Sequence, residues 1–236
     1  MKIPATVLGI AALVCISGSA LAGQRDGDHG AAVARLTARP EIIQALDLAR
    51  DLEAGAESDL IELTEIPAPP FGEAARAARF AEMLQVAGLP DVSIDDVGNV
   101  IARRAGVGAG ETVAIVAHLD TVFPSGTDVT VRRRGERLYA PGIGDDTRGL
   151  VLLLNVARVL ERADIRTVAD ILFVGSVGEE GLGDLRGVRH LLRRGGPRVD
   201  RVIAIDGGSD RRVVNQALGS RRYRVTLTGP GGHSWG

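Results

Sequence analysis

The chain has 236 residues, of which 45% are hydrophobic and 25% charged, and its formal net charge at pH 7 is −2. This composition is typical of a globular protein with enough residues for one large hydrophobic core. The near-neutral charge excludes a strong electrostatic attraction to nucleic acid or to acidic membranes, and the low aromatic content of 3% argues against stacking platforms for bases.

The N-terminus has the pattern of a secretory signal peptide. Lys2 supplies a positive charge, an apolar run covers residues 7–16, and residues 20–22 form a small-x-small cleavage site. We therefore expect a signal peptide over residues 1–22, export to the periplasm or the medium, and no membrane attachment after cleavage. An uncleaved N-terminal anchor is the alternative. Cys15, the only cysteine, lies in this segment, so a metal can be bound in the mature chain only through oxygen and nitrogen.

The remaining elements follow from composition and hydrophobic periodicity. Residues 23–36 are polar and glycine-rich and predict a loose leader. Apolar residues at helical spacing predict helices over residues 42–52, 60–66, 74–87, 148–160 and 185–194. Apolar runs predict strands over residues 92–103, 112–117, 170–174 and 201–205, with a hairpin over 129–139 that turns at Gly135.

The alternation of strands and helices after residue 100 indicates an α/β sheet covered by helices on both faces. We expect this domain to cover residues 37–215. Side chains alternate between polar and apolar over residues 222–227, which is typical of a half-buried antiparallel strand, so a second domain is expected to begin within residues 216–236. A glycine-rich stretch follows that strand without a closing element, which suggests the front portion of a longer protein.

Four acidic motifs lie at or near the ends of predicted strands. They are His118 and Asp120, Asp145 and Asp146, Glu179 and Glu180, and Asp206. Binding sites in such sheets form at the carboxyl ends of strands. Carboxylates gathered there repel one another unless a positive charge is bound, and two divalent metal ions suit this many acids.

Each motif also has a structural reading. His118 and Asp120 can be an incidental pair, and Asp206 can be a turn residue. Asp145 and Asp146 can form a helix cap, and Glu179 and Glu180 can lie in a surface turn. In the functional reading, the histidine binds metal and Asp120 holds its other ring nitrogen. One of the paired glutamates then binds metal while its neighbour accepts a proton from water.

Taken together, the motifs resemble the two-zinc exopeptidase family that includes aminoacylases, carboxypeptidase G, tripeptide aminopeptidase and succinyl-diaminopimelate desuccinylase. The resemblance runs from about residue 60 to residue 236 and includes the loop over residues 229–234. It implies a mixed sheet with helices on both faces, a metallohydrolase domain over residues 37–215, and the start of a small α+β lid or dimerisation domain over 216–236.

The resemblance also implies a set of metal ligands. His118 and Asp206 would bind one metal, Asp145 would bridge both metals, and Glu180 would bind the other. The implied cofactors are two Zn²⁺ ions per full-length subunit, with Co²⁺ or Mn²⁺ as alternatives. The family has a later histidine that completes the second metal site, and this sequence does not contain it.

The implied reaction is hydrolysis of an amide bond in a small peptide or an N-acyl amino acid by a metal-bridging water. Glu179 would be the general base and Asp120 would orient the metal-binding histidine. His233 would be the lid-domain histidine that reaches an active site, often that of the partner subunit, and steadies the oxyanion. A full-length chain would form a homodimer through its lid.

Two other functions remain open at this point. The chain can be an inactive metal-binding fragment of such an enzyme, or a metal-dependent phosphoesterase. The second fits the acids but lacks a clear cluster of basic residues for phosphate.

Overall fold

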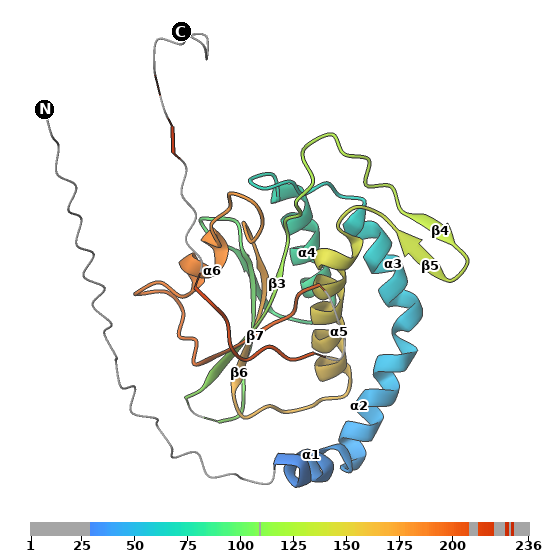
Figure 1. Cartoon of the computed structure of the whole chain (residues 1–236). Helices are drawn as coiled ribbons and strands as arrows, with labels where there is room; N and C mark the ends of the chain where they lie inside the picture. The colour runs from blue at the N-terminus through green and yellow to red at the C-terminus, as the bar shows by residue number, and fades with distance from the viewer. Residues whose placement is uncertain (1–28, 109, 208–211, 220–224, 227, 229–236) are drawn as a thin grey trace, which may run out of the picture.

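The computed structural model describes residues 29–108, 110–207, 212–219, 225–226 and 228. Its centre is a five-stranded sheet with the strand order β1-β2-β6-β3-β7 (Figure 1). The strands are β1 (Asp91–Ile94), β2 (Val100–Arg104), β3 (Thr112–His118), β6 (Asp170–Ser176) and β7 (Arg201–Ala204). Strand β3 runs parallel to β6 and β7, whereas β2 runs antiparallel to β1 and β6, so the predicted mixed sheet is confirmed.

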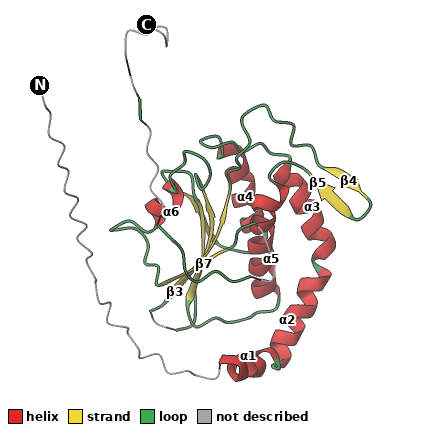
Figure 2. Cartoon of the chain, viewed as in Figure 1, coloured by secondary structure: helices red, strands yellow, loops and turns green. Residues whose placement is uncertain are grey.

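Helices cover both faces of this sheet, as predicted (Figures 1 and 2). They are α1 (His29–Thr37), α2 (Pro40–Asp51), α3 (Glu53–Thr64), α4 (Ala74–Val86), α5 (Arg148–Arg162) and α6 (Arg186–Leu191). Helices α3, α4 and α5 lie on one face and α6 lies on the other. None of the helices in the described residues is long and apolar enough to cross a membrane.

The larger core lies between the sheet and helices α4 and α5, because each helix presents one apolar stripe. In α4 the buried positions include Ala77, Phe80 and Leu84, which follow the i, i+3, i+7 spacing of a helix face. Helix α5 repeats the pattern with Leu150, Leu153 and Ala157. A smaller core lies on the opposite face, where Leu191 of α6 packs against strands β3 and β6.

The strand predicted over residues 92–103 is instead two strands joined by a turn. The Oδ1 atom of Asp95 accepts hydrogen bonds from the backbone N–H groups of Val97, Gly98 and Asn99. This local bonding replaces the sheet hydrogen bonds that a continuous strand would need and reverses the chain. The predicted hairpin is confirmed as β4 (Arg132–Arg134) and β5 (Arg137–Tyr139) beside α3 (Figure 2).

The N-terminal region is more helical than the sequence predicted. Most of the expected loose leader over residues 23–36 lies in α1, and residues 53–59 belong to α3. Alanine is the commonest residue of α1, and it favours a helix even where, as here, no residue is buried. The predicted signal peptide, four of the six residues of the predicted strand over 222–227, and His233 lie outside the described residues.

The parallel pairing of β3 with β6 determines where the acidic motifs meet. His118, the last residue of β3, lies opposite Ser176, the last residue of β6. The N–H of Leu119 then donates to the carbonyl of Ser176 at 2.7 Å, so the pairing continues one residue further. The two segments that follow therefore leave the sheet side by side at its carboxyl edge.

Candidate metal centre

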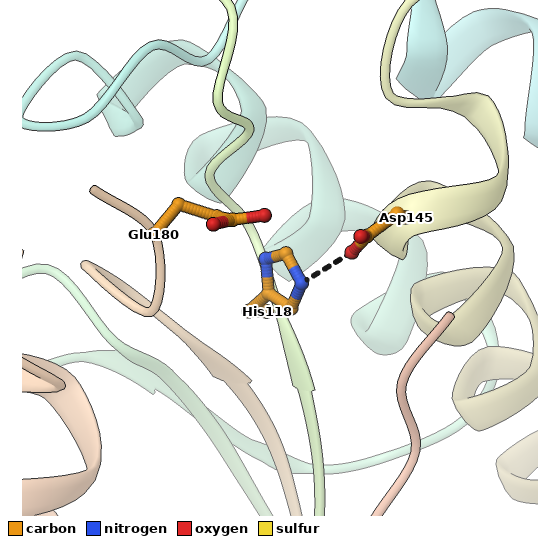
Figure 3. Close-up of side chains that lie close together, drawn as sticks. All are labelled: His118, Asp145 and Glu180. Carbon is orange, nitrogen blue, oxygen red and sulfur yellow. Dashed lines mark hydrogen bonds and ion pairs between the residues drawn. The ribbon is translucent and has the colours of Figure 1, made fainter. Parts of the chain in front are cut away.

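Three of the predicted site residues converge at this edge of the sheet. His118 ends β3, Glu180 lies in the loop after β6, and Asp145 lies in the short helical turn η1 (Ile143–Thr147) before α5. Each offers one ligand atom, and these atoms lie within 4.8 Å of one another. Figure 3 shows the carboxylates of Asp145 and Glu180 directed toward the imidazole from opposite sides.

The buried imidazole of His118 is held at both nitrogens. Its Nδ1 lies 2.9 Å from the backbone carbonyl oxygen of Asp120, and its Nε2 lies 2.9 Å from Oδ1 of Asp145. Both partners accept hydrogen bonds, so this arrangement favours a proton on each ring nitrogen when no metal is bound. Burial of the imidazole lowers the pKa of His118. The nearby carboxylates, above all those of Asp146 and Asp120, outweigh burial and raise this pKa overall. A metal at Nε2 would replace that proton.

The two neighbouring aspartates of η1 point in different directions. The side chain of Asp145 is 59% exposed and faces His118. Asp146 is buried, and its carboxylate accepts from the backbone N–H groups of His118 and Gly149. Burial raises the pKa of Asp146 to about 7. The helix-cap reading therefore applies to Asp146, at the start of α5, and leaves Asp145 to the site.

The loop after β6 presents a pair of glutamates held by Asp120. The backbone N–H groups of Glu179 and Glu180 donate to the two carboxylate oxygens of Asp120 at 3.1 and 2.8 Å. Gly178 precedes them with a φ of +67°, a left-handed conformation that favours glycine. Burial raises the pKa of both glutamates, and repulsion from neighbouring carboxylates adds to the shift.

Asp120 does not form a carboxylate–histidine pair with His118. Its backbone carbonyl, not its carboxylate, meets the ring Nδ1, and the carboxylate oxygen Oδ1 lies 3.8 Å away. The fully buried carboxylate instead joins the segment after β3 to the segment after β6.

Asp206 lies at the rim of the cluster, and His233 lies outside the described residues. The Oδ1 atom of Asp206 is 3.8 Å from Nε2 of His118, and its side chain is 58% exposed. Sequence reasoning missed Arg76, which is fully buried behind the site and donates to the carbonyl of Leu119. One signal existed: Arg76 lies on the apolar stripe of α4, four residues before Phe80.

The cluster opens into a space that can hold a small ligand. Asp145 and Glu180 line a cavity of about 420 Å³ together with Phe123 and Arg148. Gly144 and Arg148 also line a larger neighbouring groove of about 1180 Å³, between helices α2, α3 and α5 and the β4–β5 hairpin. Volumes of this size suit small-molecule and short-peptide ligands.

Comparison with known proteins assigns part of the chain to a family. Residues 114–229 match the model of peptidase family M20/M25/M40, and this range carries all of the acidic motifs. Residues 114–229 therefore carry a domain of this peptidase family. Carboxypeptidase G2 of Pseudomonas sp. (strain RS-16) is 26% identical over 58% of this chain and 33% of its own length.

Other M20/M25/M40-like proteins extend the comparison. A protein of Pyrobaculum aerophilum, described as a putative LysW-lysine/LysW-ornithine hydrolase, is 31% identical over 74% of this chain and 47% of its own length. The structure of aminopeptidase PepT from Bacillus cereus superposes with a TM-score of 0.56 and 24% identity, over 65% of this chain and 43% of that one. The chain thus spans between a third and a half of the length of the curated relatives named here.

Proposed function

We propose that this chain forms the catalytic domain of a metal-dependent hydrolase that cleaves an amide bond in a small peptide or an N-acyl amino acid. The observation that carries the proposal is the grouping of His118, Asp145 and Glu180 within 4.8 Å at the carboxyl edge of the sheet. The match of residues 114–229 to the M20/M25/M40 peptidase family supports the same reaction class.

The donor set fits a divalent transition metal. One imidazole nitrogen and two carboxylate oxygens match the ligands that zinc uses in catalytic sites, where a further position stays open. Neighbouring carboxylates contribute to the raised pKa values of His118, Glu179 and Glu180, and a bound cation would neutralise part of that negative charge. In this proposal His118, Asp206 and Asp145 would hold one Zn²⁺, and Asp145 with Glu180 would hold a second.

The chemistry follows from the groups around this donor set. A divalent cation supplies a Lewis acid that polarises the amide carbonyl. Glu179 accepts the proton of the attacking water on a carboxylate oxygen, and its raised pKa brings it closer to working pH. The water oxygen bonds to the carbonyl carbon, the carbon–nitrogen bond breaks, and Glu179 returns the proton to the leaving nitrogen.

Other residues hold this geometry or extend it. Asp120 holds the backbone of Glu179 through a hydrogen bond of 3.1 Å and so keeps the base close to the proposed ligands. We assign His233 to the stabilisation of the oxyanion that forms on carbonyl attack. We also propose that residues 37–215 form the catalytic domain, that residues 216–236 begin a lid domain through which subunits dimerise, and that the protein is exported.

The test combines zinc binding with hydrolysis. The chain is stripped with a chelator and titrated with Zn²⁺, Co²⁺ or Mn²⁺, while dipeptides, tripeptides, N-acyl amino acids and a phosphate ester are offered as substrates. We expect metal-dependent hydrolysis of an amide and none of the phosphate ester, and the His118→Ala variant should lose tight zinc binding. Absence of zinc binding by the wild type would refute the proposal, and cleavage of the phosphate ester alone would favour a phosphoesterase.

A further inference from the structure

Arg76, in the first turn of α4, is an unusual residue to find in a hydrophobic core. It is 0% exposed, and among the described residues its guanidinium makes no ion pair within 4.0 Å. It donates instead to three backbone carbonyls: Leu119 at 2.9 Å, Ile66 at 3.0 and 2.7 Å, and Thr64 at 3.4 Å. Burial lowers the pKa of Arg76 to about 10, which reflects the cost of placing a cation there.

One of the carbonyls that Arg76 holds, that of Leu119, belongs to the segment after β3 that carries part of the proposed metal site. Leu119 separates His118, which offers a ligand nitrogen, from Asp120. Asp120 in turn holds the ring of His118 through its carbonyl and the backbone of Glu180 through its carboxylate. A shift of the Leu119 peptide therefore moves both the histidine and the anchor of the glutamate.

The same turn of α4 also fixes the far end of the loop that carries Glu180. Glu73, three residues before Arg76, accepts two hydrogen bonds of 2.8 and 2.7 Å from Nη2 of Arg186, at the start of α6. Next to it, the N–H of Gly187 donates to the carbonyl of Val177 at 2.9 Å and closes the loop. The segment after β3 and the loop that carries Glu180 are thus both held by the start of α4.

We propose that Arg76 is a positioning residue for the metal centre, which it serves by fixing the Leu119 peptide. The inference rests on the proposed metal site. A planar guanidinium offers five donors in a fixed fork and can bond three carbonyls at once, whereas a lysine ammonium on a flexible stem cannot reproduce that arrangement. The requirement is therefore for the shape of the side chain as well as its charge.

A positioning role and a purely electrostatic effect of Arg76 predict opposite changes in zinc affinity when the residue is replaced, so the proposal can be tested. A buried positive charge behind the site repels a divalent cation, so removing that charge alone would strengthen zinc binding. Loss of the fork releases the Leu119 peptide and weakens zinc binding, as changes to groups that orient metal ligands generally do. A positioning role thus requires weaker binding in both the charged and the uncharged variant.

The experiment compares Arg76→Lys and Arg76→Met with matched changes at Arg104, at the end of β2. Arg104 is also largely buried and donates to the carbonyls of Leu160 and Ile165, and unlike Arg76 it also pairs with a carboxylate, that of Glu161. It lies opposite Ile171, at the far end of β6 from the metal centre. Zinc dissociation constants are measured in the full chain by competition with a chromophoric chelator. Urea unfolding of the metal-free protein reports the stability of each variant.

We expect Arg76→Met to weaken zinc binding by about 10- to 100-fold and Arg76→Lys by about tenfold. The Arg104 variants should lose stability but keep the zinc affinity of the wild type. Wild-type affinity in Arg76→Lys, or tighter binding in Arg76→Met, would overturn the inference, as would equal weakening in the Arg104 variants. If Arg76→Met shows no cooperative unfolding, Arg76→Lys alone decides. A wild-type chain that binds no zinc refutes the proposed function itself.

Discussion

The substitution Asp120→Asn tests how the two halves of the site are joined, because it changes one oxygen to nitrogen at nearly constant volume. The carboxylate of Asp120 is fully buried and accepts from the N–H groups of Glu179 and Glu180. An asparagine has one acceptor oxygen, so its amide group must face one of these N–H groups donor to donor.

The cost follows from these two hydrogen bonds. A buried N–H left without an acceptor costs about 1–3 kcal/mol, and a hydrogen bond to a charged group contributes about 1.5–3 kcal/mol. We therefore expect Asp120→Asn to lower the free energy of unfolding by about 2–5 kcal/mol. At about 2–4 °C per kcal/mol for a domain of this size, Tm falls by about 4–20 °C. Zinc binding should weaken by about 10- to 100-fold, because the backbone of Glu180 loses its anchor.

The assay is thermal unfolding of the metal-free protein together with zinc titration. Asp170→Asn is the matched control, because Asp170 also accepts from a backbone N–H, that of Gly106, but lies at the start of β6. This control should lose less stability and keep its zinc affinity. If Tm and zinc affinity of Asp120→Asn equal those of the wild type, the carboxylate does not hold the Glu179–Glu180 loop and the reasoning fails.

Three further predictions concern catalysis, pH and processing. In an active form, Glu179→Gln should lower turnover by about 100- to 10,000-fold at unchanged zinc content, whereas Glu180→Gln should lose zinc; the reverse pattern would exchange their roles. The raised pKa values of His118 and Asp146 mean that the native metal-free protein holds protons that the unfolded chain has released. Its urea midpoint should therefore fall as pH rises from about 5 to 8, and a midpoint that rises with pH would contradict this. N-terminal sequencing of the exported protein should begin at Gly23, and recovery of an intact N-terminus in the soluble form would count against cleavage.

The sequence predicted well those helices and strands whose structure follows from the pattern of apolar residues within the element itself. Helices α4 and α5 follow their apolar stripes, and β3 and β6 follow continuous apolar runs bounded by polar residues. The strand over residues 92–103 was predicted wrongly because the single carboxylate of Asp95 redirects three backbone N–H groups. Hydrophobic periodicity carries no information about such a turn.

The convergence of the site was predictable only in part. Motifs at the ends of parallel strands must share one edge of the sheet, which is why His118 and Glu180 could be expected near each other. The sequence does not indicate which atom of Asp120 meets the imidazole, because that depends on how the chain leaves β3. Arg76 was missed because charged residues are rarely fully buried, and its carbonyl partners come from two distant segments.

The wide spacing of His118, Asp145 and Glu180 along the chain has a kinetic consequence. These residues come together only after β3 and β6 have paired in parallel, and the crossover between those strands contains all of α5. Such non-local pairing forms slowly, because a long loop must close, at a cost in entropy, before any contact between the strands stabilises it. Zinc ligands clustered within a few residues can bind metal before the chain has folded. Here the complete set of proposed ligands exists only in a nearly finished sheet, so bound zinc should prolong the lifetime of the native state rather than accelerate folding.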